Sequence, residues 1–219
     1  RDEAAGLPSF HLGLGQVYHR LGRAAEGDAE IGQVLAMGDP ALELEAAHTY
    51  RDLGLSSQAQ EIAQRVYDGG VAPHAQNAAM LMSLLAATLE DEELWLSRAD
   101  QSSDFVQINL LQARARRLAR DGDLRQAETL FGQVADRFLR LSSHDTAALN
   151  NAAIALQQRY ACSGNPAHLA RSVELMEQAQ RLAPESGLTA ANLAELLAFA
   201  GNVAVLDRFV HTRELHLEG

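Results

Sequence analysis

Apolar and small residues recur along the chain in segments of helical spacing, separated by glycine, proline and short polar turns. This pattern predicts twelve helices, at residues 8–21, 24–37, 40–53, 56–69, 72–88, 91–99, 104–120, 124–140, 145–161, 166–182, 187–200 and 203–216. The sixth helix is short and begins with acids, Glu90 to Glu93, which suit the positive end of a helix dipole.

One pattern of small, large apolar and glycine residues occurs three times with unchanged spacing. Its copies are Gly15, Tyr18, Gly22, Gly27, Ile31 and Val34; Ala47, Tyr50, Gly54, Ala59, Ala63 and Val66; and Ala115, Leu118, Gly122, Ala127, Phe131 and Val134. Small residues let two helices approach closely, and the glycine ends the first of them. Each copy therefore predicts a pair of antiparallel helices.

Three further copies, which begin at Ala79, Ala153 and Ala194, keep part of the pattern. The successive copies start 32, 32, 36, 38 and 41 residues apart, so the period drifts along the chain. The glycines that share one phase of the pattern are Gly22, Gly54, Gly122 and Gly201.

The stretch Leu14-Gly15, Tyr18 and Gly22, with Pro40 closing the unit, resembles the fingerprint of tetratricopeptide repeats, although Gly27 replaces the usual alanine. The resemblance covers residues 8–216 and implies an all-α, right-handed superhelical solenoid of about six antiparallel helix pairs. The repeats are expected near 8–39, 40–71, 72–103, 104–144, 145–185 and 186–216. We expect a single repeat domain over 1–219, cut from a longer protein because the chain opens without a methionine. An irregular helical bundle is the alternative.

Composition narrows the function classes. All 18 basic residues are arginine, which excludes a Walker-type phosphate loop and a Schiff-base lysine. The formal charge of -11 argues against nucleic-acid binding and against docking on an anionic membrane. No apolar run reaches the roughly 20 residues that span a bilayer. The single cysteine, Cys162, excludes an internal disulfide and slightly favours a cytosolic location.

The resemblance implies that the first helix of each pair lines a concave surface, where polar side chains contact a partner. On the seventh helix, Asn109, Gln112, Arg116 and Arg120 form one stripe, because they are spaced three, four and four residues apart. Residues 104–125 carry a net charge of +2 on an acidic chain. Further groove candidates on other first helices are His48, Arg51, Asn150 and Gln157.

The expected partner is a protein or peptide, either acidic or with a free C-terminal carboxylate. Tetratricopeptide domains that bind chaperone tails hold such a carboxylate with Lys, Arg and Asn; here only arginine could replace the lysines, with bidentate geometry. Alternatively, these arginines only pair with Asp121, Asp123 and Glu128. The predicted function is an interaction scaffold. The second hypothesis is a sensory or regulatory array attached to an enzyme or transcription regulator, binding a peptide or small ligand.

No catalytic, metal or cofactor site is expected. His211, Glu214 and His216 are spaced three and two residues apart, which does not converge well on one metal ion. Cys162 has His144 and His168 nearby in sequence but lies beside a Gly-Asn-Pro loop without an oxyanion-hole motif. We therefore interpret Cys162 as a bystander thiol and expect no enzymatic activity.

Overall fold

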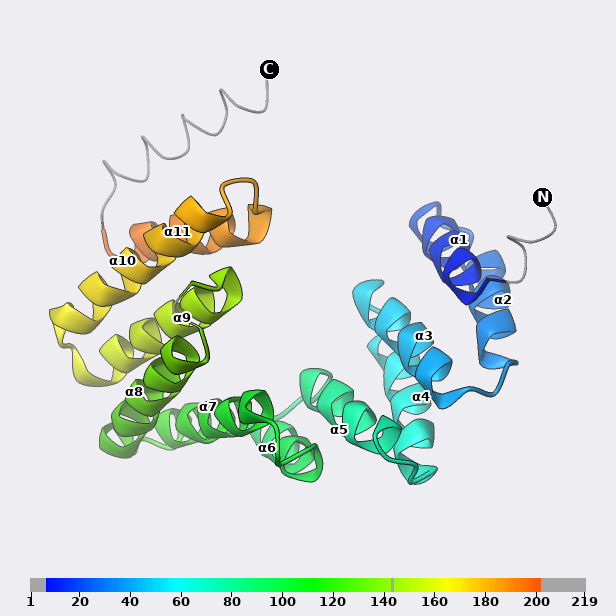
Figure 1. The fold of residues 1–219 in the computed structure, drawn as a ribbon, viewed down its shortest axis with the longest axis horizontal. Coiled ribbons are helices and arrows are strands. Elements are labelled where there is room, and N and C mark those ends of the chain that lie inside the picture. Colours follow the sequence, from blue (N-terminus) through cyan, green and yellow to red (C-terminus); the bar gives the residue numbers. More distant parts are fainter. Residues whose placement is uncertain (1–6, 143, 202–219) are drawn as a thin grey trace, which may run out of the picture. The chain divides into compact units, whose positions relative to one another are not determined.

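The computed structural model describes residues 7–142 and 144–201, which form eleven α-helices joined by turns (Figure 1). The chain divides into two compact units, Arg1–Leu110 and Leu111–Gly219, and the boundary falls within one helix, α7. The helices are α1 (Pro8–Arg20), α2 (Ala24–Leu35), α3 (Pro40–Asp52), α4 (Ser56–Asp68), α5 (His74–Leu84), α6 (Leu89–Arg98), α7 (Asp104–Arg120), α8 (Leu124–Leu141), α9 (Thr146–Ser163), α10 (Pro166–Leu182) and α11 (Gly187–Phe199).

Eleven of the predicted helices are present, and most bounds agree within two residues. The largest difference is at the fifth helix, predicted at 72–88, because α5 ends at Leu84. Thr88 explains the next boundary: its hydroxyl accepts a hydrogen bond from Asp91 N at 3.1 Å, so α6 begins at Leu89 rather than at residue 91. The predicted acidic first turn of α6 is confirmed. The predicted twelfth helix, 203–216, lies outside the described residues.

The repeated glycines end the first helices in one common way. Gly54 has a φ of +75°, its N–H donates to Arg51 O at 2.9 Å, and the next N–H donates to Tyr50 O at 2.9 Å. This left-handed ending satisfies the last carbonyls of the helix and turns the chain into the second helix. Both bonds recur at Gly22 and Gly122, with φ values of +75° and +90°, and Gly201 has a φ of +67°. The predicted role of the glycines is confirmed.

The first pair is held at close range by Gly15 and Gly27. A Cβ atom on Gly27 would lie 2.5 Å from Cδ2 of His19 and 2.9 Å from the carbonyl oxygen of Gly15. The His19 ring therefore takes the space that an alanine would need, which explains why glycine stands at this position of the repeat. Asp28 Oδ1 fixes the ring, because it lies 2.9 Å from His19 Nε2 and accepts a hydrogen bond from the Tyr50 hydroxyl at 3.0 Å.

Buried apolar residues join neighbouring helices within each unit. In the first unit, α1 contacts α2 and α3, α3 contacts α4 and α5, and α4 contacts α5, so consecutive pairs are neighbours. In the second unit, Ala115 of α7 packs with Ala127 and Phe131 of α8, and Cys162 of α9 borders this cluster. Both units are thus all-α stacks of antiparallel helix pairs.

Among the described residues, none of the helices is long and apolar enough to cross a membrane.

The glycine turn gives a direct test of this architecture. Replacing Gly54 with alanine places a Cβ on a left-handed residue, so the free energy of unfolding should fall by about 1–2 kcal/mol. Denaturant unfolding followed by circular dichroism measures this change. The control is Gly32→Ala inside α2, where a Cβ has open space and helix propensity should raise stability by up to about 1 kcal/mol. Equal effects of both substitutions would contradict the assigned role of Gly54.

Candidate functional site

A groove of about 320 Å³ lies between α3 and α5, which are the first helices of two consecutive pairs in the first unit. Its apolar lining comes from both helices and includes Leu84, which is 58% exposed. The polar lining consists of a carboxylate, two imidazoles and an amide. The lining residues are Ala41, Leu44, Glu45, His48, His74, Asn77, Met80, Leu81 and Leu84.

His48 is a residue that the sequence analysis proposed for partner contact, and it lies in this groove. Burial and then the charge of Arg51 lower the pKa of the imidazole, while Asp52 and Glu45 act in the opposite direction. The lowered pKa favours the neutral ring at neutral pH. A neutral imidazole offers one hydrogen-bond donor and one acceptor to a ligand.

Arg51, the second candidate on α3, lies beside the groove and does not line it. Its Nη2 and Nε atoms are 2.7 Å and 3.0 Å from Oδ1 of Asp52. The guanidinium therefore has a carboxylate neighbour on its own helix. Its part in binding stays a prediction.

In the second unit, Asn150, which was proposed as a groove residue, is buried at 8% exposure, and its part in binding stays a prediction. Its Oδ1 accepts a hydrogen bond of 2.8 Å from Nδ2 of Asn192, which lies on α11. Asn192 was not among the residues predicted from the sequence. A signal was present, because Asn192 follows Asn150 by 42 residues, close to one period of the last repeats.

The stripe predicted on α7 has mixed surroundings. Gln112 and Arg116 are half-buried, as is Gln157 on α9, whereas Arg120 is exposed. The amide of Asn109 donates to Phe105 O at 2.8 Å, so it is engaged with its own helix. Partner binding by these residues stays a prediction.

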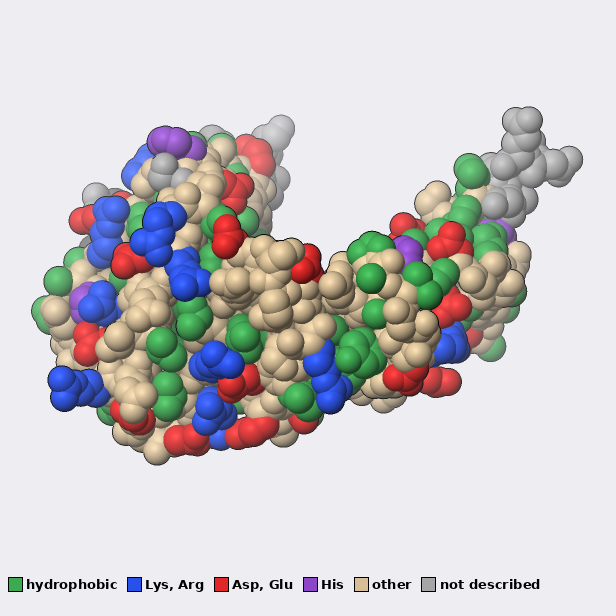
Figure 2. All heavy atoms as spheres, turned by 60° about the horizontal axis from the view of Figure 1, so that its bottom comes forward, with side chains coloured by type: hydrophobic (Ala, Val, Ile, Leu, Met, Phe, Trp, Pro, Cys, Tyr) green, Lys and Arg blue, Asp and Glu red, His purple; other side chains and the backbone are tan. Residues whose placement is uncertain are grey.

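The alternative, in which the arginines pair with local acids, holds for part of the cluster. Asp121 lies 3.7 Å from Arg117 and 2.9 Å from Arg120. Asp123 instead caps α8 by accepting from Gln126 N at 3.1 Å. Glu128 faces partners on other helices. Figure 2 accordingly shows basic side chains next to acidic ones over the second unit.

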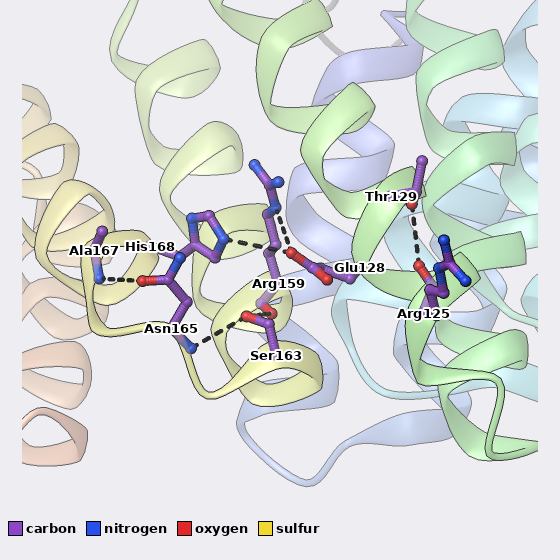
Figure 3. A network of polar contacts seen from close by, with 8 residues as sticks. All are labelled: Arg125, Glu128, Thr129, Arg159, Ser163, Asn165, Ala167 and His168. Carbon is purple, nitrogen blue, oxygen red and sulfur yellow. Dashed lines mark hydrogen bonds and ion pairs between the residues drawn. The ribbon is translucent and has the colours of Figure 1, made fainter.

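Glu128 joins three helices of the second unit (Figure 3). From α8 its Oε1 points between Nε of Arg159 on α9, at 3.6 Å, and Nε2 of His168 on α10, at 3.5 Å. Gly132 makes room for the guanidinium, since a Cβ there would lie 3.2 Å from Cζ of Arg159. These contacts therefore link side chains of α8, α9 and α10.

Cys162 is half-buried, and burial followed by the charge of Glu128 raises the pKa of its thiol. A raised pKa lowers the thiolate fraction, in the opposite direction to an activated nucleophile. Across residues 7–142 and 144–201, no three His, Cys, Asp or Glu side chains form a group that could hold a metal ion. His211, Glu214 and His216 lie outside these ranges.

No family model matches the sequence, and no curated protein matches it. Among solved structures, human IFIT1 in a dimer with PPP-AAAA aligns with a TM-score of 0.45 and 13% identity, over 91% of this chain and 58% of that one. The chain thus spans less than two thirds of human IFIT1. The crystal structure of YrrB, a TPR protein with an unusual peptide-binding site, aligns with a TM-score of 0.42 and 14% identity, over 86% and 92% of the two chains.

The class of protein follows from the helix pairs themselves. Antiparallel pairs recur along the chain, and their first helices end in the same glycine turn at Gly22, Gly54 and Gly122. The chain therefore has a tetratricopeptide-like architecture, in which antiparallel helix pairs stack on one another.

The contacts of Glu128 predict a measurable contribution to the free energy of unfolding. Glu128→Gln removes the negative charge next to the partly buried guanidinium of Arg159, so the free energy of unfolding should fall by about 1–2 kcal/mol. The matched control is Glu174→Gln, because Glu174 pairs at 2.8 Å with Arg171 and both side chains are more than half exposed. This control should change stability by about 0–1 kcal/mol.

The same variant has a second readout at Cys162, the one cysteine of the sequence. Because Glu128 raises the pKa of the thiol, Glu128→Gln should lower that pKa and speed alkylation at mildly alkaline pH. The pH dependence of the alkylation rate measures it. An unchanged rate in Glu128→Gln, together with equal stability of the two Gln variants, would show that these contacts of Glu128 are not formed.

Proposed function

We propose that this protein is a binding scaffold, without catalysis, that holds a peptide segment of a partner protein on its first helices. The observation that carries the proposal is the groove between α3 and α5. Two first helices of consecutive pairs line it, and it combines an apolar floor with hydrogen-bonding groups. Ligand sites typically have this composition, in which apolar area supplies affinity and a few polar groups set orientation.

The chemistry of the groove suits one apolar side chain of a peptide together with its backbone. Leu44 and Leu81 are buried beneath it, while Leu84 is largely exposed at its surface and would be covered by a ligand. His48 and Asn77 are exposed and can donate to or accept from peptide groups. Burying one leucine-sized side chain contributes about 1.5–3 kcal/mol, enough to anchor a segment.

A second contact region of the same function is proposed on the first helices of the second unit. Asn150 is buried and accepts from Nδ2 of Asn192, which is half-buried, so the Oδ1 atom of Asn192 can accept from a peptide group. Arg116 and Arg120, with Gln112 and Gln157, would attract an acidic segment or a C-terminal carboxylate. The net charge of +2 over 104–125 supports this preference.

The groove is tested with a displayed library of random linear peptides, selected on the parent protein. Enriched peptides should bind Leu84→Glu about tenfold or more weakly, because a carboxylate replaces the apolar contact. Leu94→Glu is the matched control, since Leu94 is 45% exposed on α6 and does not line the groove. Calorimetry or fluorescence anisotropy measures both affinities. Equal binding by the two variants, or a selection that enriches no peptide, would refute the groove.

The arginines are tested with a synthetic peptide that ends in several acidic residues and a free carboxylate. Arg116→Ala with Arg120→Ala should weaken binding about tenfold or more, because each charge-assisted hydrogen bond contributes about 1.5–3 kcal/mol. The control, Arg171→Ala with Arg181→Ala, removes the same charge from exposed positions of the second unit. Equal losses of binding in both double variants would show that the effect comes from the change in net charge. No loss in either variant would exclude the carboxylate site.

A further inference from the structure

The first helix carries a stripe of apolar side chains that the rest of the described chain leaves exposed. Phe10, Val17 and Leu21 are 46%, 49% and 65% exposed, and Leu14 is half-buried. Their spacing of four, three and four residues places them on one face of α1. A continuous apolar face of this kind marks an interaction surface more often than scattered exposed residues do.

The equivalent face of the next repeat can be compared with this stripe. α1 and α3 are equivalent at an offset of 32 residues, because Pro8 and Pro40 both occupy the first turn and Gly22 and Gly54 both end the helix. The α3 positions that correspond to the stripe are Leu42, Ala46, Thr49 and Leu53.

These α3 positions are covered. Ala46 and Thr49 are 0% and 6% exposed, and Leu42 and Leu53 pack against the core of the first unit. The helices that contact α3 from the preceding repeat are α1 and α2. A side chain at this phase is therefore buried where a helix pair precedes it.

The next first helix, α5, repeats the result. Ala78 and Leu81, one further offset of 32 residues along, are 0% and 1% exposed, and α5 contacts both α3 and α4. Val17, Thr49 and Leu81 thus occupy one position of the repeat at 49%, 6% and 1% exposure.

Two other pairs of equivalent positions keep the same exposure in both helices. Gly13 on α1 and Glu45 on α3 are both exposed, and so are Arg20 and Asp52. The change from 49% exposure at Val17 to 6% at Thr49 falls on the face that a preceding pair covers. The apolar side chains of this face on α1 suit burial against a helix pair, as the equivalent side chains of α3 and α5 do.

We propose that the apolar stripe of α1 is a docking surface for an antiparallel helix pair of the same repeat class. The occupant packs on α1 as the α1–α2 pair packs on α3. Its chemistry is that of two amphipathic helices presenting an apolar face, not that of an extended peptide, because helices cover the equivalent surfaces of α3 and α5. The stripe is separate from the groove between α3 and α5, so the two proposals stand or fall independently.

The probe is the first repeat of this chain, added in register. A chain of residues 1–39 followed directly by residues 8–219 places a second copy of the α1–α2 pair in front of the native one. Its new junction, Asp39 before Pro8, reproduces the Asp39-Pro40 junction that starts α3. We expect one cooperative transition with Tm raised by about 5 °C, because a stacked repeat adds a nearest-neighbour interface.

The control makes the same substitution, Val17→Glu, in either the native or the added copy of the first repeat. Val17→Glu in the native copy faces the added pair and should abolish the gain in Tm, whereas the same change in the added copy is exposed and should keep it. In the parent chain Val17→Glu should leave Tm within about 1 °C, since the side chain is half exposed.

Either of two results would overturn the proposal: an extended chain without a gain in Tm, or equal effects of Val17→Glu in the two copies. Sedimentation equilibrium of the parent chain tests the other occupant. A dimer that Val17→Glu dissociates would show that a second copy covers the stripe and would replace the helix pair. A monomer at all concentrations supports the assignment.

Discussion

The structure depends on one constraint: a helix pair of this size cannot bury all of its own apolar surface. Two short helices cover each other along one seam, and each leaves a further apolar face that must be covered by a neighbour. In the first unit this requirement is met by contact between consecutive pairs, which is why Ala46 and Ala78 are fully buried. The glycine turns serve the same constraint, since Gly22 and Gly54 return the chain so that the second helix can cover the first.

Local features of the fold could be predicted from sequence because they depend on neighbours along the chain. A left-handed glycine, a proline in the first turn and the spacing of apolar residues each act within about five residues, and the eleven helices predicted within the described residues are present. The boundary between α5 and α6 was missed because Thr88 was not recognised as a cap. The substitution of Gly27 for alanine was noticed, but its cause, the ring of His19, needed the packing of α1 on α2.

The site was harder to predict because it depends on how different helices are turned toward each other. His48 was proposed as a polar residue on a first helix, and the groove that contains it was not foreseen, since its other wall comes from α5. Asn150 was proposed as a groove residue, and its bond to Asn192 joins residues 42 positions apart. A drifting repeat period makes such pairs difficult to align, because one inserted residue turns a helix position by about 100°.

The arginine–carboxylate pairs of this protein differ in their exposure to solvent and in whether they join separate helices. This difference decides which arginines can exchange partners. Arg120 and Asp121 are adjacent and solvated, so their attraction contributes little to stability and leaves the guanidinium able to exchange partners. Arg159 and Glu128 are less exposed and join separate helices, so their separation would disturb the packing of α8 on α9. A ligand carboxylate can therefore compete for an arginine of the first kind, whereas an arginine of the second kind is held by the fold. The proposed binding of an acidic partner therefore rests on exposed arginines such as Arg120, and not on arginines held between helices.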